Sequence, residues 1–186
     1  MEGFIAAFAL VFCAEMGDKT QLIAMTFAAR YSWRPVMAAV LAATLANHGL
    51  AVGLGMLLGG LLPEAEMRFC GSVAFIVFGL WTLREGDDEE EDGAFSGYSP
   101  FWTVALTFFL GEMGDKTQLA VLTIAAEQGA WLPVLAGSTS AMLLADGLGV
   151  ALGTKLRYLV SPKAMKKISA CIFLACGAAG LASFLL

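Results

Sequence analysis

The chain has 186 residues, of which 59% are hydrophobic and 15% are charged, and its mean hydropathy is +0.76. This composition excludes an ordinary soluble globular domain as the first interpretation and favours a membrane protein. The net charge of −5 has a local origin, because seven of the sixteen acidic residues lie within residues 85–92. No nucleic-acid partner is expected.

Six segments have the length and apolar character of membrane spans, for which about 20 residues are needed. In chain order they are 4–29, 36–61, 67–83, 100–126, 132–154 and 167–185. Prolines and glycines lie in the connections between them. The first segment has neither a basic leader nor a cleavage signal, so we expect a retained span. The sequence therefore predicts an all-α membrane protein with six transmembrane helices.

An eight-residue motif occurs twice. Glu-Met-Gly-Asp-Lys-Thr-Gln-Leu stands at residues 15–22 and again at residues 112–119. The repeat continues at an offset of 98, which aligns Trp33-Arg34-Pro35-Val36 with Trp131-Leu132-Pro133-Val134. We therefore predict a three-helix repeat at residues 1–84, a linker at 85–99 and a second repeat at 100–186. An odd number of spans per repeat inverts the second half, as in many secondary transporters, whose substrate site lies at the repeat interface.

The basic residues outside the motifs predict the orientation. Eight lie in or beside the first, third and fifth connections, and only Arg68 lies on the other side. Because basic residues accumulate in cytoplasmic loops, both termini are expected outside the cytoplasm and the acidic linker inside it.

Each motif brings two carboxylates and one amine to membrane depth, where ionisable groups indicate a functional site. Residues three or four apart share a helical face, so the carboxylates and lysine of each copy are expected to point the same way. The motif glycines allow either close helix packing or a local unwinding. The four carboxylates expected to converge are Glu15, Asp18, Glu112 and Asp115. Further oxygen ligands could come from Thr20, Gln21, Thr117 and Gln118.

An oxygen-rich set of this kind suits a hard divalent cation such as Mn²⁺, Ca²⁺ or Mg²⁺. Four carboxylates with Lys19 and Lys116 sum to −4 + 2 = −2, which one divalent cation or two protons would neutralise. Clustered carboxylates also bind protons more readily when no metal is present. We therefore predict cation/proton exchange, with the lysines pairing with the emptied carboxylates. The alternative is that buried Glu–Lys pairs only hold helices together.

One further acid, Asp146, lies well inside a predicted span, and its repeat counterpart is His48, the only histidine. Asp146 is a candidate for a proton relay or for a helix-packing hydrogen bond. His48 is more often a satisfied polar contact than a transport residue in such a position.

The doubled motif, E-x-G-D-[KR]-[TS], resembles that of a cation/proton antiporter family which includes the human Golgi manganese transporter and bacterial manganese exporters. The resemblance covers essentially the whole chain. It implies export of Mn²⁺, or also Ca²⁺, from the cytoplasm in exchange for H⁺, with the metal held by Glu15, Asp18, Glu112 and Asp115. The chain lacks the N-terminal extension of eukaryotic members, so a prokaryotic plasma membrane is the expected location. No resident cofactor is expected, and a homo-oligomer stays open.

Two other functions remain alternatives. A passive cation channel would use similar carboxylates, but buried lysines and inverted halves fit alternating access better. An intramembrane aspartyl protease also needs two membrane-embedded aspartates. The glutamate before and the lysine after each Gly-Asp pair do not suit protease chemistry, so no catalytic residue and no enzyme activity are predicted.

Overall fold

In the computed structural model of the protein, residues 1–61, 63–84, 99–152 and 162–185 are described, and they form eight helices and no strand. The prediction of an all-α protein is thus confirmed for these residues. The helices are α1 Glu2–Glu15, α2 Lys19–Arg30, α3 Trp33–Leu61, α4 Glu64–Arg84, α5 Pro100–Glu112, α6 Lys116–Gln128, α7 Trp131–Leu152 and α9 Pro162–Leu185. Most of the predicted linker, residues 85–98, lies outside the described residues.

The first and fourth predicted spans are not continuous helices. Each of the segments 4–29 and 100–126 is divided at its motif, between α1 and α2 and between α5 and α6. The breaks occur at Gly17 and Gly114, whose φ angles of 78° and 79° are incompatible with a continuing right-handed helix. The expectation that the carboxylates and lysine of one motif share a single helical face is therefore wrong.

The other four predicted segments correspond to α3, α4, α7 and α9. Among the described residues, two helices are long and apolar enough to cross a bilayer, Trp33–Leu61 and Trp131–Ala151. Shorter apolar stretches are Phe69–Arg84 and Ala170–Ala182. The halves of the divided segments have only 12 to 14 residues each, less than the ~20 that one span needs. The arrangement of six spans therefore stays a prediction.

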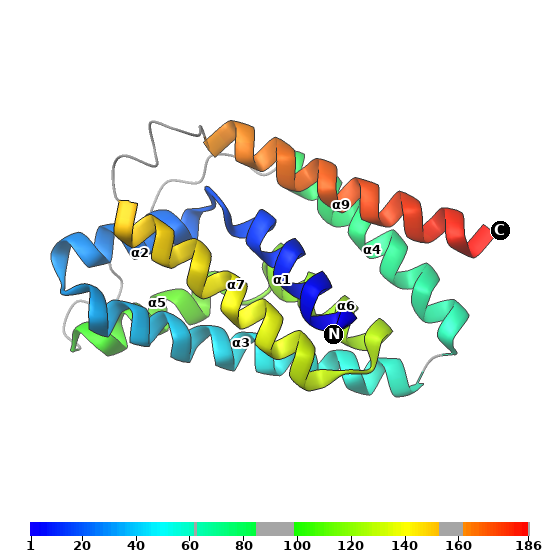
Figure 1. The fold of residues 1–186 in the computed structure, drawn as a ribbon, viewed down its shortest axis with the longest axis horizontal. Coiled ribbons are helices and arrows are strands. Elements are labelled where there is room, and N and C mark those ends of the chain that lie inside the picture. The colour runs from blue at the N-terminus through cyan, green and yellow to red at the C-terminus, as the bar shows by residue number, and fades with distance from the viewer. Residues whose placement is uncertain (62, 85–98, 153–161, 186) are drawn as a thin grey trace.

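Helices within residues 1–84 pack against helices within residues 100–185. The main contacts join α1 to α7, α3 to α5 and α6, and α4 to α9. In Figure 1, α1 and α2 run leftward, whereas α5 and α6 run rightward. The two copies of the motif therefore meet inside the bundle from opposite directions.

Glycines allow the closest of these helix contacts. A side chain at Gly55 or Gly59 of α3 would overlap the carbonyl groups of Leu122 and Ala126 in α6. Small residues at such positions let two helix backbones approach each other. Because Gly55 and Gly59 have no side chains, α3 and α6 can pack closely, and this contact helps to position the second motif.

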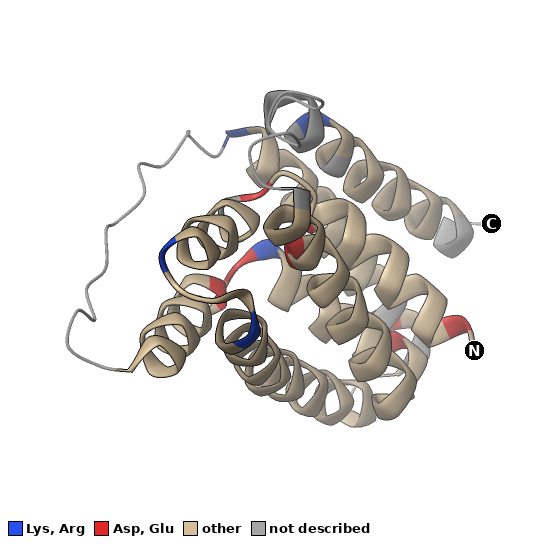
Figure 2. Ribbon diagram, turned by 60° about the vertical axis from the view of Figure 1, so that its left-hand side comes forward, with Lys and Arg blue, Asp and Glu red and all other residues tan. Residues whose placement is uncertain are grey.

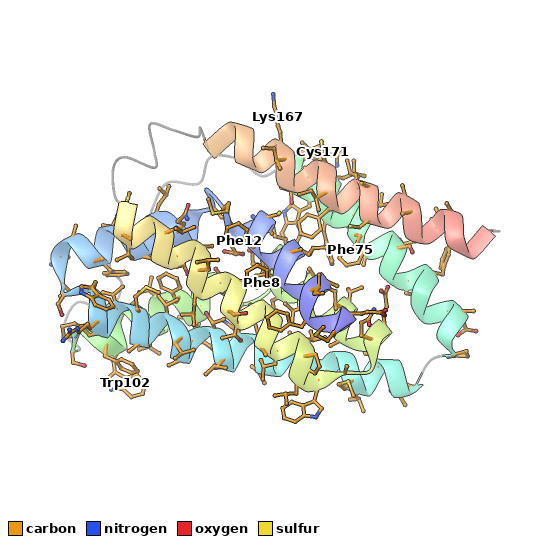
Figure 3. The ribbon with its side chains drawn as sticks, in the orientation of Figure 1. Phe8, Phe12, Phe75, Trp102, Lys167 and Cys171 are labelled. Carbon is orange, nitrogen blue, oxygen red and sulfur yellow. The ribbon has the colours of Figure 1, made fainter. Side chains whose placement is uncertain are left out.

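Buried apolar residues form two clusters, one on each side of the motifs. The first contains Ala14 of α1 and an aromatic group of Phe75, Phe78 and Phe173. Phe8 and Phe12 pack against this cluster, and Figure 3 shows them beside Phe75.

The second cluster contains Ala24 of α2 and Phe108 of α5. Because the chain leaves the first cluster at Ala14 and enters the second at Ala24, the first motif crosses the polar layer between them. The second motif follows Phe108 and precedes Ala120 of the first cluster, so it crosses the same layer.

Candidate metal site

The two helix breaks have nearly the same backbone conformation. After each positive-φ glycine the chain is extended, at φ −78° and ψ 169° for Asp18 and at φ −73° and ψ 163° for Asp115. Each aspartate N–H donates to the carbonyl of the glutamate three residues earlier, at 3.1 Å in the first break and 3.2 Å in the second. Each aspartate thus stands at the start of a new helix, directly after the helix that ends at its glutamate.

In each break, a glutamine side chain accepts a hydrogen bond from the backbone N–H of the glycine. Gln21 accepts a hydrogen bond from the N–H of Gly17 at 2.9 Å, and Gln118 accepts one from the N–H of Gly114 at 2.7 Å. These glutamine oxygens were candidate metal ligands on sequence grounds. In this structure they satisfy backbone donors that the broken helix would otherwise leave unpaired.

The same two glutamines also bind the opposite half of the chain. Gln21 donates through Nε2 to the carbonyl of Ala145 on α7 at 2.6 Å. Gln118 donates to the side-chain oxygen of Asn47 on α3 at 3.3 Å, and Asn47 in turn donates to the carbonyl of Phe109 at 2.9 Å. Each break is therefore held against a helix of the other predicted repeat.

Three of the four predicted carboxylates come together in the interior. Glu15, Glu112 and Asp115 each offer an oxygen within 4.8 Å of the others, and their exposed fractions are 0%, 2% and 7%. Asp18 lies at the edge of this group with a side chain that is 18% exposed. In Figure 2, acidic and basic segments lie close together in the middle of the largely uncharged bundle.

An ion pair joins the two motifs. Nζ of Lys116 lies 2.8 Å from a carboxylate oxygen of Asp18, and the lysine side chain is only 6% exposed. The lysine of the second motif thus neutralises an aspartate of the first. The side chain of Lys19, the other predicted charge-coupling residue, lies outside the described part of the structure.

The two glutamates have different hydrogen-bond partners. Glu15 accepts from the hydroxyl of Thr20 at 2.9 Å and from the hydroxyl of Thr117. Glu112 is equally buried, yet neither of its carboxylate oxygens has a hydrogen-bond partner among the described residues. The predicted threonine ligands therefore both act on the glutamate of the first motif.

Asp146 and His48 lie on the helices that flank the motifs, α7 and α3. Asp146 is fully buried and follows Ala145, the residue that binds Gln21. Neither of its carboxylate oxygens has a hydrogen-bond partner among the described residues, and the same holds for Nδ1 of His48. The helix-packing hydrogen bond that was the alternative for Asp146 is therefore not made by these residues.

This arrangement demands positive charge. Several carboxylates in a poorly hydrated interior repel each other, and their burial as anions is costly unless they are paired. Lys116 supplies one positive charge. A divalent cation or bound protons would supply the rest, and carboxylate oxygens are the ligands that hard divalent cations prefer.

Some contributors to this site were not predicted from the sequence. The carbonyl of Ala145 and the side chain of Asn47 hold the glutamines, and they occupy equivalent repeat positions, 98 residues apart. The 98-residue offset between the repeats was the feature of the sequence from which the equivalence of Asn47 and Ala145 could have been predicted. The cross-motif contacts of Lys116 and Thr117 had no signal in the sequence beyond the identity of the two copies.

A comparison with family profiles matches the chain to the family described as divalent cation/proton antiporter GDT1. The match covers residues 3–90 and 100–185, which is nearly the whole chain. No solved structure matches the chain.

Curated relatives match over most of their length. A Vibrio cholerae protein named as a candidate manganese exporter is 35% identical over 163 residues, covering 87% of this chain and 81% of the relative. A GDT1-like protein of Synechocystis is 29% identical, covering 93% of both chains. GDT1-like protein 5 of Arabidopsis thaliana is 26% identical, covering 95% of this chain and 94% of the relative.

Proposed function

Because the chain belongs to the GDT1 family of divalent cation/proton antiporters, we propose that it exports Mn²⁺ in exchange for protons at the buried carboxylates of the two motifs. The family consists of transporters, so the protein is not an enzyme and the alternative of an intramembrane protease falls away. The metal is the transported substrate, and no resident cofactor is part of the proposal.

One observation carries this proposal: oxygens of Glu15, Glu112 and Asp115, contributed by two separate helix breaks, lie within 4.8 Å of one another in the interior. Asp18 is the fourth member of the proposed site, and it becomes available when Lys116 moves away from it. The carbonyl groups at the ends of α1 and α5 are further candidate oxygens, since those of Glu15 and Glu112 accept one hydrogen bond each and a carbonyl oxygen has two lone pairs. Broken helices supply cation ligands in this way in other transporters.

Charge balance explains why the exchange would be coupled. The four carboxylates with two lysines carry −2, which either one divalent cation or two protons cancel. Occupation by both at once would leave uncompensated positive charge in a poorly hydrated site. We propose that Lys19 and Lys116 pair with the carboxylates when the metal leaves, and the Lys116–Asp18 ion pair supports this role. Asp146 is the proposed proton relay, since it is buried near the site without a hydrogen-bond partner among the described residues.

We propose six spans in two inverted halves, with residues 1–84 and 100–186 as the repeats and residues 85–99 as a cytoplasmic linker. The opposite directions of α1 and α5 support the inversion (Figure 1). The two divided segments would each cross the bilayer as a pair of short helices, which is tolerated where the break is buried in protein. The excess of basic residues in the first, third and fifth connections supports extracytoplasmic termini.

Manganese is the proposed substrate and export is the proposed direction, with a prokaryotic plasma membrane as the location. The name of the Vibrio relative, a candidate manganese exporter, supports both the substrate and the direction. Ca²⁺ has the same preference for carboxylate and carbonyl oxygens and is the second candidate cation. Thr20 and Thr117 remain candidate ligands through their second lone pairs, because each donates its proton to Glu15.

Transport in proteoliposomes tests this function. Purified protein is reconstituted, a pH gradient is imposed, and uptake of Mn²⁺, Ca²⁺ and Mg²⁺ is measured together with the internal pH. Antiport predicts Mn²⁺ flux that requires the gradient and moves protons the opposite way. Metal flux that ignores the gradient would instead support a passive channel.

Glu15→Gln and Asp115→Asn should each abolish this flux while the protein stays folded in the membrane. Both changes keep the size of the side chain and remove only its charge. Retained transport in either variant would remove that residue from the proposed site.

A further inference from the structure

Two connections between helices occupy equivalent repeat positions and differ in charge. The α2–α3 connection reads Arg30-Tyr31-Ser32-Trp33-Arg34, and the α6–α7 connection, 98 residues later, reads Gln128-Gly129-Ala130-Trp131-Leu132. The two indole rings are almost equally exposed, at 58% for Trp33 and 56% for Trp131. The fold therefore has a surface tryptophan at both positions, whereas two arginines occur at only one of them.

Each arginine of the α2–α3 connection lies over an aromatic ring. Cζ of Arg30 is 5.9 Å from the centre of the Tyr31 ring, and Cζ of Arg34 is 5.5 Å from the centre of the Trp33 ring. Tyr31 in turn stacks on Phe27 and packs against the second apolar cluster. A ring below a guanidinium group holds the cation in place, and the N–H donors in the plane of the group can still bind an anion.

The positive charge of this connection is not neutralised by the described part of the protein. Arg30 and Arg34 are both exposed, and neither has an ion-pair partner among the described residues. The exposed acidic residues of that part lie at the starts of α1 and α4 and at the end of α6, toward the opposite end of the bundle (Figure 1); they are Glu2, Glu66 and Glu127. The connection is therefore suited to an anion from outside the protein.

The neighbouring tryptophan indicates which anion fits. Indole rings are favoured at the level of the lipid headgroups, and arginine binds phosphate through two parallel N–H bonds. The cytoplasmic leaflet, on whose side the α2–α3 connection is proposed to lie, is rich in anionic lipids that attract basic residues. A phospholipid offers a phosphate to the arginines and acyl chains to the exposed indole ring, whereas a free anion would use the arginines alone.

We propose that Arg30 and Arg34 bind the phosphate of an anionic phospholipid of the cytoplasmic leaflet, whose acyl chains contact Trp33. This inference goes beyond the proposed transport function and requires only that the α2–α3 connection lies at a membrane surface. Because α2 runs from the first helix break to Arg30, the bound lipid holds the far end of α2 at that surface. The equivalent connection, with Gln128 and Leu132 in place of the arginines, has no such preference for anionic lipid.

Fluorescence quenching measures the lipid preference at each connection. One variant keeps Trp33 and another keeps Trp131, with the other tryptophans replaced by phenylalanine. Each full-length variant is reconstituted in phosphatidylcholine mixed with phosphatidylglycerol, and one lipid or the other carries brominated acyl chains, which quench a nearby indole ring. The ratio of quenching by the two brominated lipids gives the binding constant of phosphatidylglycerol relative to phosphatidylcholine at that ring.

Trp33 should report a preference for phosphatidylglycerol of roughly 20-fold, and Trp131 should report a ratio near one. Each basic residue near an anionic surface contributes roughly fivefold, so Arg30→Gln and Arg34→Gln should each lower the preference by about that factor. The double variant should abolish it. Added salt should weaken the preference, because exposed charges are screened. Native mass spectrometry of the chain with all its tryptophans gives a second readout, in which phosphatidylglycerol stays bound to the parent protein and is lost from the double variant.

The repeat supplies a matched control that gains the property. Gln128→Arg together with Leu132→Arg gives the second connection the cations of the first. In the variant that keeps Trp131, this double replacement should create a preference for phosphatidylglycerol of roughly fivefold or more. Misfolding would not create such a preference, so the gain tests the role of the arginines independently of any loss.

Three outcomes overturn the proposal. Equal quenching of Trp33 by the two lipids would show that the arginines bind no lipid. Displacement of the lipid by inorganic phosphate, beyond the effect of chloride at the same ionic strength, would show a site for free anions. A stronger preference after the acidic residues of 85–92 are replaced by their amides would show that the linker occupies the arginines. Each result leaves the proposed exchange of Mn²⁺ for protons standing, because flux in proteoliposomes measures that exchange separately.

Discussion

At the residue scale, the site is organised around one carboxylate with hydrogen-bond donors and one without. Glu15 accepts from two hydroxyls, and Glu112 has no hydrogen-bond partner among the described residues although it is 2% exposed. A buried acceptor that lacks a partner lowers stability, so such groups persist mainly where they have a function. The burial of Glu112 without such a partner therefore supports the proposal that it binds a cation or a proton.

Glu112→Gln separates function from folding. The amide has the size of the carboxylate but cannot carry its charge, so Mn²⁺ transport should fall by more than the roughly 10–100-fold that loss of an outer partner of a metal ligand causes. The melting temperature in metal-free detergent solution should not fall, because a buried, unpaired carboxylate contributes no net stability as an anion. Thr82→Val is the control, since its hydroxyl on α4 is also buried without a partner among the described residues. The Thr82→Val variant should keep full transport. Transport of Mn²⁺ by the Glu112→Gln variant would contradict the proposed site.

At the element scale, the helix breaks place the chemistry. Glu15 ends α1 and Glu112 ends α5, and one residue with positive φ then turns the chain into the next helix. The breaks occur in the polar layer between two apolar clusters, where backbone groups can be satisfied by glutamine side chains. The motif thus encodes its own interruption of the helix, with glycine for the conformation and glutamine for the freed N–H group.

Gly114→Ala tests the break. A Cβ at Gly114 would meet no atom within 4 Å, so the cost comes from the φ of 79° alone and should be about 1–2 kcal/mol of stability. Because the strain falls between Glu112 and Asp115, Mn²⁺ transport should fall as well. Gly129→Ala is the matched control, with open space, a φ of 60° and a position at the end of α6. It should lose similar stability in thermal melts and keep transport. Equal effects of both variants on transport would contradict a special role for the break.

Helix approach gives a second test at this scale. At Gly55 of α3, an added Cβ would overlap the carbonyl of Leu122 in α6, whereas at Gly53 it would meet nothing within 4 Å. Gly55→Ala should therefore cost about 1–3 kcal/mol through overpacking and displace the second motif. Gly53→Ala should be neutral or slightly stabilising, since alanine favours a helix. Thermal melts and Mn²⁺ transport of the two variants measure the difference, and similar behaviour of both would disprove the close approach.

The sequence predicted candidate residues for the site but not their arrangement. The identity of two eight-residue copies singled out the carboxylates as candidates, because charge at membrane depth is rare. It did not decide between close packing and unwinding at Gly17 and Gly114, since glycine permits both backbone conformations. The asymmetry between Glu15 and Glu112 could not be predicted from the motifs, because the two copies are identical and the difference must come from their surroundings.

At the scale of the whole molecule, the two halves complete each other. Helices of one half pack mainly against helices of the other, with α1 on α7 and α3 on α5 and α6. The contacts Lys116–Asp18 and Thr117–Glu15 also cross between the halves. A half of the chain would leave its carboxylates without these partners. The assembled bundle, and not either repeat, is therefore the smallest unit that can form the site.

The orientation of the bundle gives the last prediction. Opposite directions of α1 and α5 agree with an odd number of spans in each proposed repeat, and two such repeats would give an even total that leaves both termini on one side of the membrane (Figure 1). The excess of basic residues in the first, third and fifth connections predicts that this side, with the linker, faces the cytoplasm, so both termini should lie outside it. Green fluorescent protein fused to the C-terminus in a bacterial host should stay dark, and alkaline phosphatase at the same position should be active. The same two reporters inserted in the linker should behave in reverse. A fluorescent C-terminal fusion would contradict the orientation without affecting the carboxylate site, since the site lies between the halves and is the same whichever way the protein is inserted.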